Sequence, residues 1–304
     1  LEVAASSEEN QLAVAAGAEY LDYNVEDLNK SREFSGVTAE QRILGSRVSC
    51  HRVRGHLDGS YRNLPEVKLS FKDGSIPGNG LGAYNSEGIA IHVDGGAQDG
   101  IGKTSFGGQM MIFKAKGKDG KFYNGSVGKG AGYGAQQGVF MFQGNADARA
   151  GIRLSGADMI FGGRLTKPLK ENHYANLGVN ANLKGFAFEY MTNGRGVVLG
   201  DPGPWICAGM TGGVVYLRHQ PELGLTKEAL QARIAKGAKV ELQPLSETGK
   251  EDLNELLGLY QDRLTEYGQT EEAAFIAELL KDLETNFMQV IPVKQQADPS
   301  VSTE

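Results

Sequence analysis

The segment from Ala97 to Thr104 loosely matches a phosphate-binding loop, because Gly102, Lys103 and Thr104 form the last part of that motif. Such a loop needs a strand before it and a helix after it, since the N–H groups at the helix N-terminus hold the phosphate. Here Ser105-Phe-Gly-Gly leads directly into an apolar, strand-like run. We therefore expect no nucleotide site at this loop.

Two glycine-rich stretches, Gly78 to Ala83 and Gly128 to Ala135, resemble part of a dinucleotide-binding fingerprint. That fingerprint opens a helix and is followed about 20 residues later by an acidic partner. Gly82 instead continues through Tyr84 and Asn85 toward another strand-like run. We interpret these glycines as turn residues.

Cys50, His51 and His56 lie close enough in the sequence to suggest a metal site. Zinc needs four ligands, or three and a water, and no second cluster supplies them. The remaining histidines, His92, His173 and His219, are scattered along the sequence. His92 stands in an apolar run, as expected of a core residue. The sequence thus indicates no catalytic, cofactor-binding or metal-ligating residue, and Trp205 is predicted to be a packing residue anchored at a turn.

The composition excludes several classes of protein. The 304 residues carry a net charge of −6, which gives no electrostatic footprint for nucleic acid. Two cysteines make no disulfide framework, and no apolar run approaches the ~20 residues of a membrane span. The sequence also lacks a signal-peptide pattern at its start, so a cytoplasmic protein is expected.

Charge is unevenly distributed along the chain. From residue 241 onward there are 14 acidic residues and 4 basic ones, whereas the preceding part is nearly neutral. A solvated helix face explains such a bias more simply than a docking surface does.

A short unit recurs through the middle of the chain: one or two glycines followed by four or five mostly apolar residues. The leading glycines stand at 88, 107, 138, 156, 194 and 212, with a usual step of 18 or 19 residues. Apolar runs of this length read as short strands. Of the 43 glycines, 33 lie between Gly74 and Gly213, as a fold with a sharp turn before every strand requires.

These observations predict an all-β core in the form of a right-handed parallel β-helix (solenoid) with a C-terminal α-helical cap. A two-sheet sandwich with irregular turns is the alternative. The glycines expected to serve the turns of the solenoid are Gly78, Gly80, Gly82, Gly107, Gly108, Gly138, Gly156, Gly194, Gly212 and Gly213.

Three segments are expected along the chain: an N-terminal helix and loop segment over 1–40, a glycine-rich β-helix domain over 41–219, and a helical cap and tail over 220–304. Capping residues and the spacing of leucines predict helices in the last segment. These helices cover 226–237, 251–267 and 270 to about 287, with an extended piece over 240–245.

Two polar excursions interrupt the repeat, at 114–123 and 164–184. Repeat proteins often place partner contacts on such insertions. The candidate partner contacts are therefore Lys116, Lys118, Lys121, Arg164, Lys167 and Lys170.

Several of these motifs, in this order, resemble the C-terminal β-helix (GXGXG) domain of the glutamate synthase large subunit. The resemblance covers about 40–293 and ends on Phe287-Met-Gln-Val-Ile-Pro292. The segments that carry it include Arg42-Ile-Leu-Gly45, Gly78-Asn-Gly-Leu-Gly-Ala-Tyr84, Gly95-Gly-Ala-Gln-Asp-Gly-Ile-Gly-Lys103, Arg153-Leu-Ser-Gly-Ala157 and Ala208-Gly-Met-Thr-Gly-Gly213. Asn193-Gly-Arg195 and Cys207 depart from the family pattern, which has Gly-Gly and an aromatic residue there.

The resemblance implies a stand-alone, non-catalytic scaffold subunit of a glutamate synthase-like complex, which transfers the amide nitrogen of glutamine to 2-oxoglutarate. Its implied partners are an amidotransferase-like subunit and a synthase-like subunit that carries FMN and iron–sulfur clusters. No cofactor is expected on this chain, and neither nucleic acid nor a membrane is an expected partner.

Two alternatives stay open at this point. The same β-helix occurs in N-methylglutamate synthase and in one of the subunits of formylmethanofuran dehydrogenase, and the helical tail favours the glutamate synthase side over formylmethanofuran dehydrogenase. An autonomous β-helix enzyme is the other alternative. A polysaccharide lyase would show clustered acids and a basic residue on one strand face, and an acyltransferase would show a strict six-residue period; neither pattern is present.

Overall fold

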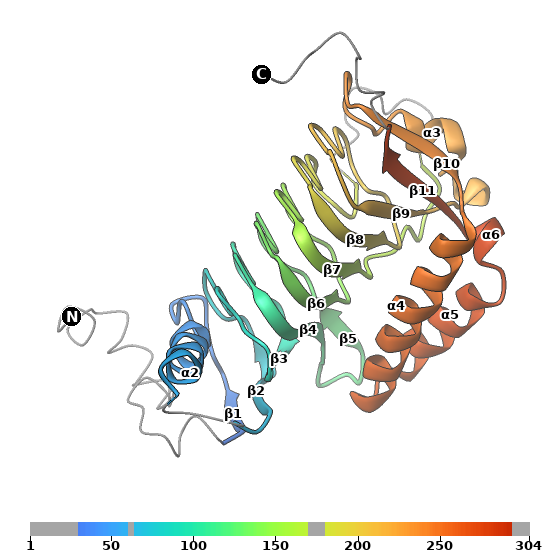
Figure 1. Ribbon diagram of the computed structural model, residues 1–304. Helices are drawn as coiled ribbons and strands as arrows, with labels where there is room; N and C mark the ends of the chain where they lie inside the picture. Colours follow the sequence, from blue (N-terminus) through green and yellow to red (C-terminus); the bar gives the residue numbers. More distant parts are fainter. Residues whose placement is uncertain (1–29, 60–63, 170–179, 294–304) are drawn as a thin grey trace, which may run out of the picture.

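The computed structural model describes residues 30–59, 64–169 and 180–293. The described chain is mainly β, with a large, mostly parallel sheet of eleven strands and helices at its C-terminal end (Figure 1). The strands are β1 (Arg32–Ser35), β2 (Val67–Ser75), β3 (Ile89–Gly95), β4 (Phe106–Lys116), β5 (Phe122–Asn124), β6 (Gln137–Phe142), β7 (Ser155–Phe161), β8 (Asn193–Val198), β9 (Val214–Arg218), β10 (Val240–Pro244) and β11 (Phe287–Pro292). The helices are α2 (Ser46–Asp58), a 3-10 turn (Pro221–Leu223), α3 (Lys227–Gln231), α4 (Glu247–Glu266), α5 (Thr270–Leu280) and α6 (Leu283–Asn286).

The strands of the sheet follow the sequence from β1 to β9, except that β5 pairs only with β4 as a hairpin. Neighbours along this path from β1 to β9 are parallel, with irregularities where β2 pairs with β3, β4 with β6 and β7 with β8, whereas β11 and β10 extend the sheet in antiparallel fashion. Like residues therefore stack across strands: Val93, Ile112, Phe142, Phe161, Val198 and Leu217 form one continuous row. The repeat in the sequence therefore reflects the stacking of equivalent residues on neighbouring strands.

Both faces of the sheet are buried, which explains why its strands are nearly continuous apolar runs. One face, with the row above, packs inside the molecule against the turns that precede the strands. The other face, which includes Met111, Ile160 and Tyr216, is covered by leucines of α4 and α5. In Figure 1 these two helices lie along one side of the strands.

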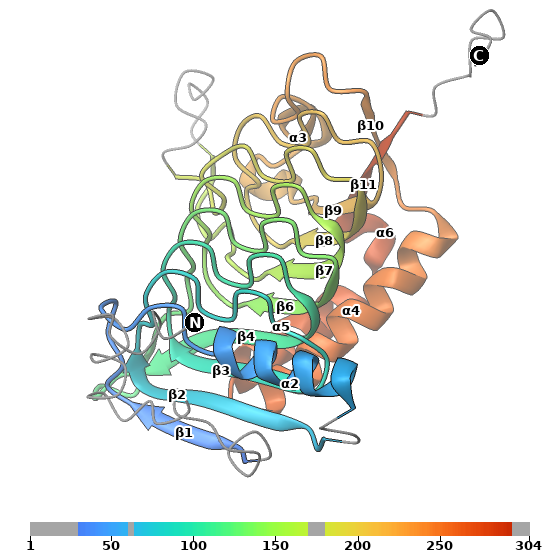
Figure 2. The same cartoon turned by 60° about the vertical axis from the view of Figure 1, so that its left-hand side comes forward.

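The connections between strands also stack on one another. Single parallel bridges join Ala97, Val127, Ala146 and Leu183 in one row away from the sheet. Figure 2 shows each loop lying beside the corresponding loop of the next repeat. The apolar side chains between this row and the sheet form the larger of the two cores.

Several elements differ from those that the sequence predicts. Residues 32–35 form a strand inside the segment expected to be helix and loop, and residues 46–58, where a metal site was considered, form the unexpected helix α2. Residues 1–29, which make up most of the segment expected to be helix and loop, lie outside the described residues. None of the helices in the described ranges is long and apolar enough to cross a bilayer.

The C-terminal helices are confirmed in outline but not in their bounds. The predicted helix at 226–237 is only the five residues of α3, and α4 begins earlier than predicted because the Ser246 hydroxyl accepts from the Gly249 N–H at 3.1 Å. The predicted helix that ends near Phe287 stops at Leu280. Its last residue instead starts β11, because Phe287 to Val290 pair with β9 and fill the sheet.

Candidate functional site

A five-residue turn precedes six consecutive repeats, and we call these turns corner segments: 80–84, 100–104, 130–134, 149–153, 186–190 and 205–209. In each corner segment the first, third and fifth residues have positive φ, as in Gly80 (+78°), Gly82 (+61°) and Tyr84 (+61°). The left-handed region favours glycine because it has no Cβ. This alternation is the physical basis of the G-x-G-x-G spacing.

Alternate left-handed residues send their N–H groups in opposite directions along the stack. Gly100 N–H donates to Lys129 of the next repeat at 2.8 Å, Gly102 N–H donates back to Leu81 at 2.8 Å, and Thr104 N–H donates forward to Tyr133 at 2.7 Å. The same pattern recurs at the other corner segments up to 186–190, and in the last one Cys207 N–H donates back to Ala187. These N–H groups therefore hold the repeats together, and strand β4 rather than a helix follows Gly102 and Lys103.

The glycines at the strand starts are needed for a second reason, which is close approach of backbone to backbone. A Cβ added to Gly108 would lie 2.2 Å from the carbonyl oxygen of Ile89, and one added to Gly194 would lie 2.3 Å from that of Ala157. The same crowding against the preceding repeat holds for Gly138, Gly156, Gly212 and Gly213, while Gly78 meets the Ala39 carbonyl and Gly107 meets the Glu87 backbone.

The predicted partner-contact residues do not form one cluster. Lys116, Lys118 and Lys121 are exposed on the β4–β5 hairpin, and Lys167 is exposed on the second excursion. Arg164 is held within the chain, because its guanidinium lies 3.3 Å from the Glu272 carboxylate and 4.1 Å from the Phe275 ring centre on α5. Lys170 lies outside the described residues.

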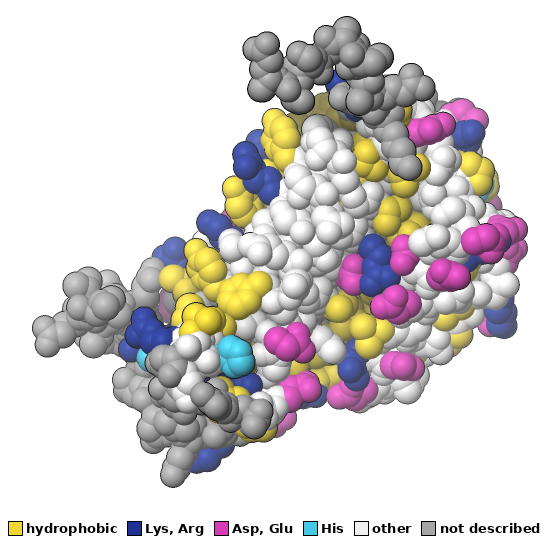
Figure 3. Space-filling view, in the orientation of Figure 1, with side chains coloured by type: hydrophobic (Ala, Val, Ile, Leu, Met, Phe, Trp, Pro, Cys, Tyr) yellow, Lys and Arg dark blue, Asp and Glu magenta, His cyan; other side chains and the backbone are white. Residues whose placement is uncertain are grey.

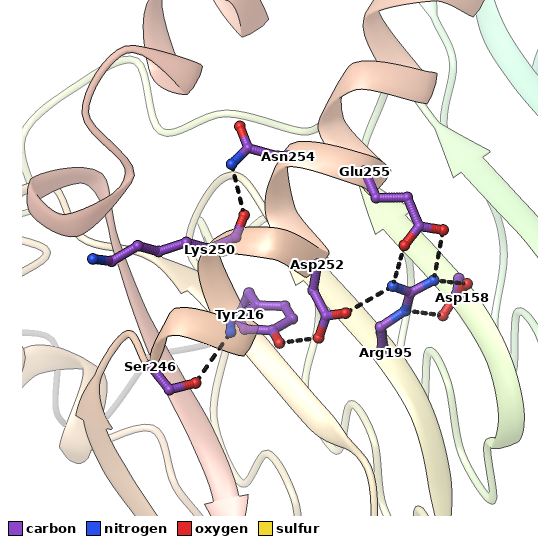
Figure 4. Close-up of polar contacts among 9 residues, drawn as sticks. Asp158, Arg195, Tyr216, Ser246, Lys250, Asp252, Asn254 and Glu255 are labelled. Atoms are coloured by element: carbon purple, nitrogen blue, oxygen red, sulfur yellow. Dashed lines mark hydrogen bonds and ion pairs between the residues drawn. The ribbon is translucent and has the colours of Figure 1, made fainter.

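A charged cluster that the sequence did not reveal joins the sheet to α4 (Figure 4). The guanidinium of Arg195 on β8 donates to both oxygens of Asp158 on β7, at 2.8 and 2.7 Å. It also donates to Asp252 (2.8 Å) and Glu255 (2.9 Å) on α4. The Tyr216 hydroxyl donates to the other Asp252 oxygen at 2.5 Å.

The electrostatics of this cluster follow from its hydrogen bonds. Asp158, Glu255 and Asp252 raise the pKa of Arg195, which therefore stays charged, and the Arg195 guanidinium lowers the pKa of Glu255. Burial, together with Asp252, raises the pKa of Tyr216. Arg195 belongs to the segment Asn193-Gly-Arg195, which departs from the family pattern. The contacts of the cluster fix the position of α4.

The histidines and cysteines do not come together. No group of three His, Cys, Asp or Glu side chains suited to a metal occurs among the described residues. Cys50 is exposed on α2, whereas Cys207 is buried in a corner segment, where burial raises the pKa of its thiol to about 12. His92 is buried and stacks on the Tyr267 ring, with centres 3.7 Å apart, and burial lowers its pKa.

Trp205 lies at a turn, as the sequence predicts, but on the surface rather than in the core. Its side chain is 52% exposed at the first position of the last corner segment, whereas Cys207 at the third position, which is also left-handed, is buried. It stacks on Phe186 of the preceding corner segment, with ring centres 5.0 Å apart. Trp205 therefore packs on the outer surface of the stacked corner segments.

Comparisons with known proteins agree with this geometry. The GXGXG motif family matches residues 19–293. The large chain of NADPH glutamate synthase from Bacillus subtilis (strain 168) is 28% identical over 254 residues, which are 80% of this chain and 15% of that protein. Ferredoxin-dependent glutamate synthases are 28% identical over 256 residues in Antithamnion sp. (84% and 14%) and 32% identical over 184 residues in Cyanidium caldarium (59% and 10%).

The chain therefore spans only 10–15% of the length of these relatives, and the stretch it matches is the C-terminal region of the glutamate synthase large chains. The match to the family covers most of the chain, including every corner segment. The chain belongs to the GXGXG motif family and is homologous to that region of glutamate synthase.

Proposed function

We propose that this chain is the non-catalytic scaffold unit of a glutamate synthase-like complex, in which it braces an amidotransferase-like subunit against a synthase-like subunit. The observation that carries this proposal is the match of residues 19–293 to the GXGXG family, together with the similarity of 80% of the chain to a glutamate synthase large chain. The complex would act in the cytoplasm and pass the amide nitrogen of glutamine to 2-oxoglutarate.

The architecture suits a brace. The sheet is buried on both faces, and hydrogen bonds join every corner segment to the next one along the chain. We propose that the repeats wind as a right-handed parallel β-helix, in which each repeat gains its stability by stacking on the next. Such a body resists bending between two partners, because bending would break several of these bonds at once.

The chain's own chemistry supports assigning the cofactors to partners. Its two cysteines cannot supply the four thiolates that an iron–sulfur cluster usually takes. The side chains of the Arg195 cluster are occupied by one another, and they hold α4 rather than face an open site. FMN and iron–sulfur clusters would therefore be carried by the synthase-like subunit.

Purification through a tag on this chain tests the proposal. We expect an amidotransferase-like and a flavin-containing protein to co-purify in fixed stoichiometry, and we expect the isolated chain to be colourless. Flavin absorbance or glutaminase activity of the isolated chain, or a complex that contains neither partner, would contradict the proposal.

Two variants separate assembly from folding. Deleting residues 116–121 removes the tip of the β4–β5 hairpin, which is exposed, so we expect a folded chain that binds its partners less well. Gly213→Val places a side chain at φ +79° and 2.7 Å from the Gly194 carbonyl, so we expect a lower melting temperature before any partner is added.

A further inference from the structure

The last three corner segments carry large side chains at their first position, where the first three carry glycine, and two of them also carry a large side chain at the fifth position. Gly130 and Gly134 are the first and fifth residues of one corner segment, and the equivalent residues of the next are Arg149 and Arg153. In the two that follow, these positions hold Phe186 and Tyr190 and then Trp205 and a glycine. We call Arg149, Arg153, Phe186, Tyr190 and Trp205 the corner ridge.

Each residue of the corner ridge carries a conformational cost. Their φ values lie between +54° and +64°, where a side chain costs about 1–2 kcal/mol relative to glycine. The non-glycine residues at the third position of a corner segment, Phe188 and Cys207, are fully buried and fill the core. Core packing does not explain the corner ridge, because Trp205 and Tyr190 are about half exposed.

The corner ridge forms two short stacks along the surface. In one, the Arg149 guanidinium lies 5.8 Å from the Phe186 ring centre, and Phe186 stacks on Trp205. In the other, the Arg153 guanidinium lies 5.6 Å from the Tyr190 ring centre. Figure 3 shows hydrophobic and basic side chains alternating along the edge that the turns form in Figure 1.

The charge of the corner ridge is only partly balanced. Arg149 Nε lies 3.7 Å from a Glu189 oxygen, which is a long ion pair. Within the described ranges, no carboxylate lies within ion-pair distance of Arg153. Exposed arginines beside tryptophan and tyrosine are the residues most often found at the energetic centre of protein interfaces.

We propose that the corner ridge is a docking surface for a protein segment that presents carboxylates beside apolar side chains. This inference rests on the proposed function, in which the segment belongs to another protein of the complex. The carboxylates would pair with Arg149 and Arg153, and the apolar groups would cover Trp205 and Tyr190. The net charge of −6 opposes a nucleic acid as the occupant.

Trp205 is the only tryptophan of the chain, so its fluorescence reports directly on the corner ridge. The probe is a soluble random copolymer of glutamate and tyrosine, titrated at low and at physiological salt, with poly-lysine and poly(dT) as alternative ligands. We expect the copolymer to change Trp205 emission and to protect it from acrylamide quenching, and we expect salt to weaken the effect.

Variants of the arginines separate binding from folding. Arg149→Gly with Arg153→Gly restores the residue that left-handed positions favour, so the melting temperature should hold or rise while copolymer affinity falls at least tenfold. The matched control, Lys227→Gln with Lys281→Gln, removes the same charge from two exposed positions outside the corner segments and the β4–β5 hairpin. Its copolymer affinity should change less than threefold.

Equal losses in the two variants, no binding by the unaltered chain, or tighter binding of poly(dT) would overturn the inference. A self-associated chain that dissociates only in the ridge variant would assign the surface to a second copy and overturn it too. Assembly with the subunits that co-purify with the chain distinguishes the two proposals. If the ridge variant assembles as the unaltered chain does, the docking surface is refuted; if the unaltered chain assembles with neither subunit, the proposed function fails, whatever the copolymer shows.

Discussion

Replacing Arg195 by methionine should loosen α4 from the sheet. Methionine keeps most of the length of the side chain but removes every hydrogen bond to Asp158, Asp252 and Glu255. Asp158 and Asp252 are then left largely buried without their cation. The expected result is a less stable chain whose first loss of structure is in the C-terminal helices.

The size of the effect follows from burial. Removing one partner of a buried ion pair costs about 3–5 kcal/mol, because the other charge stays behind. The Arg195 side chain is 22% exposed and that of Glu255 is 67% exposed, so water screens part of the loss. We therefore expect about 2–3 kcal/mol, which corresponds to a fall of about 5–10 °C in the melting temperature.

Urea unfolding followed by helix circular dichroism measures this change. The matched control is Lys281→Met, which breaks an ion pair of two exposed side chains and should cost less than about 0.5 kcal/mol. Asp158→Asn should also cost less in the Arg195→Met background than in the unaltered chain, because the two residues are coupled. An Arg195→Met chain as stable as the control would refute the role given to this cluster.

Three further predictions concern glycine, thiols and pH. Gly102→Ala should cost about 2–3 kcal/mol more than Gly130→Ala in urea unfolding, because both have φ +64° but only the first would place its Cβ 2.0 Å from a phenylalanine ring; equal costs would contradict the packing argument. A thiol reagent at pH 8 should modify Cys50 in the folded chain and Cys207 only after unfolding, since burial raises the pKa of the Cys207 thiol. Rapid modification of both thiols in the folded chain would contradict this. Because burial lowers the pKa of His92 in the folded state, the unfolded state binds the proton more readily, and the free energy of unfolding should fall as pH drops below about 6.5. His92→Gln should make this fall with pH shallower. An unchanged dependence of the free energy of unfolding on pH would exclude His92 as the cause.

The sequence predicts the repeating part of the molecule well. A glycine followed by a short apolar run identifies β3, β4 and β6 to β9, because these strands are buried on both faces and need a sharp turn before them. Local sequence signals fail where a contact with a residue distant in the sequence determines the secondary structure. Phe287 looks like the end of a helix, yet pairing with β9 makes it a strand residue.

The candidate site was less predictable than the fold. Helix α2 lies between Gly45 and Gly59, both left-handed, and these two glycines are the signal that could have revealed it. The Arg195 cluster has no such signal, since its acids come from 37 to 60 residues away. The corner ridge could have been found by aligning the repeats, because its residues occupy the glycine positions of the motif.

The central claim, that this chain is a scaffold without chemistry of its own, is tested most directly by glutamate formation from glutamine and 2-oxoglutarate. The assay compares the complex purified through this chain, the partner subunits after the chain is removed, and the same subunits after it is added back. The account predicts activity in the complex, its loss on removal, its return on addition, and none in the isolated chain. Full activity of the partners without the chain, or any turnover by the chain alone, would contradict it.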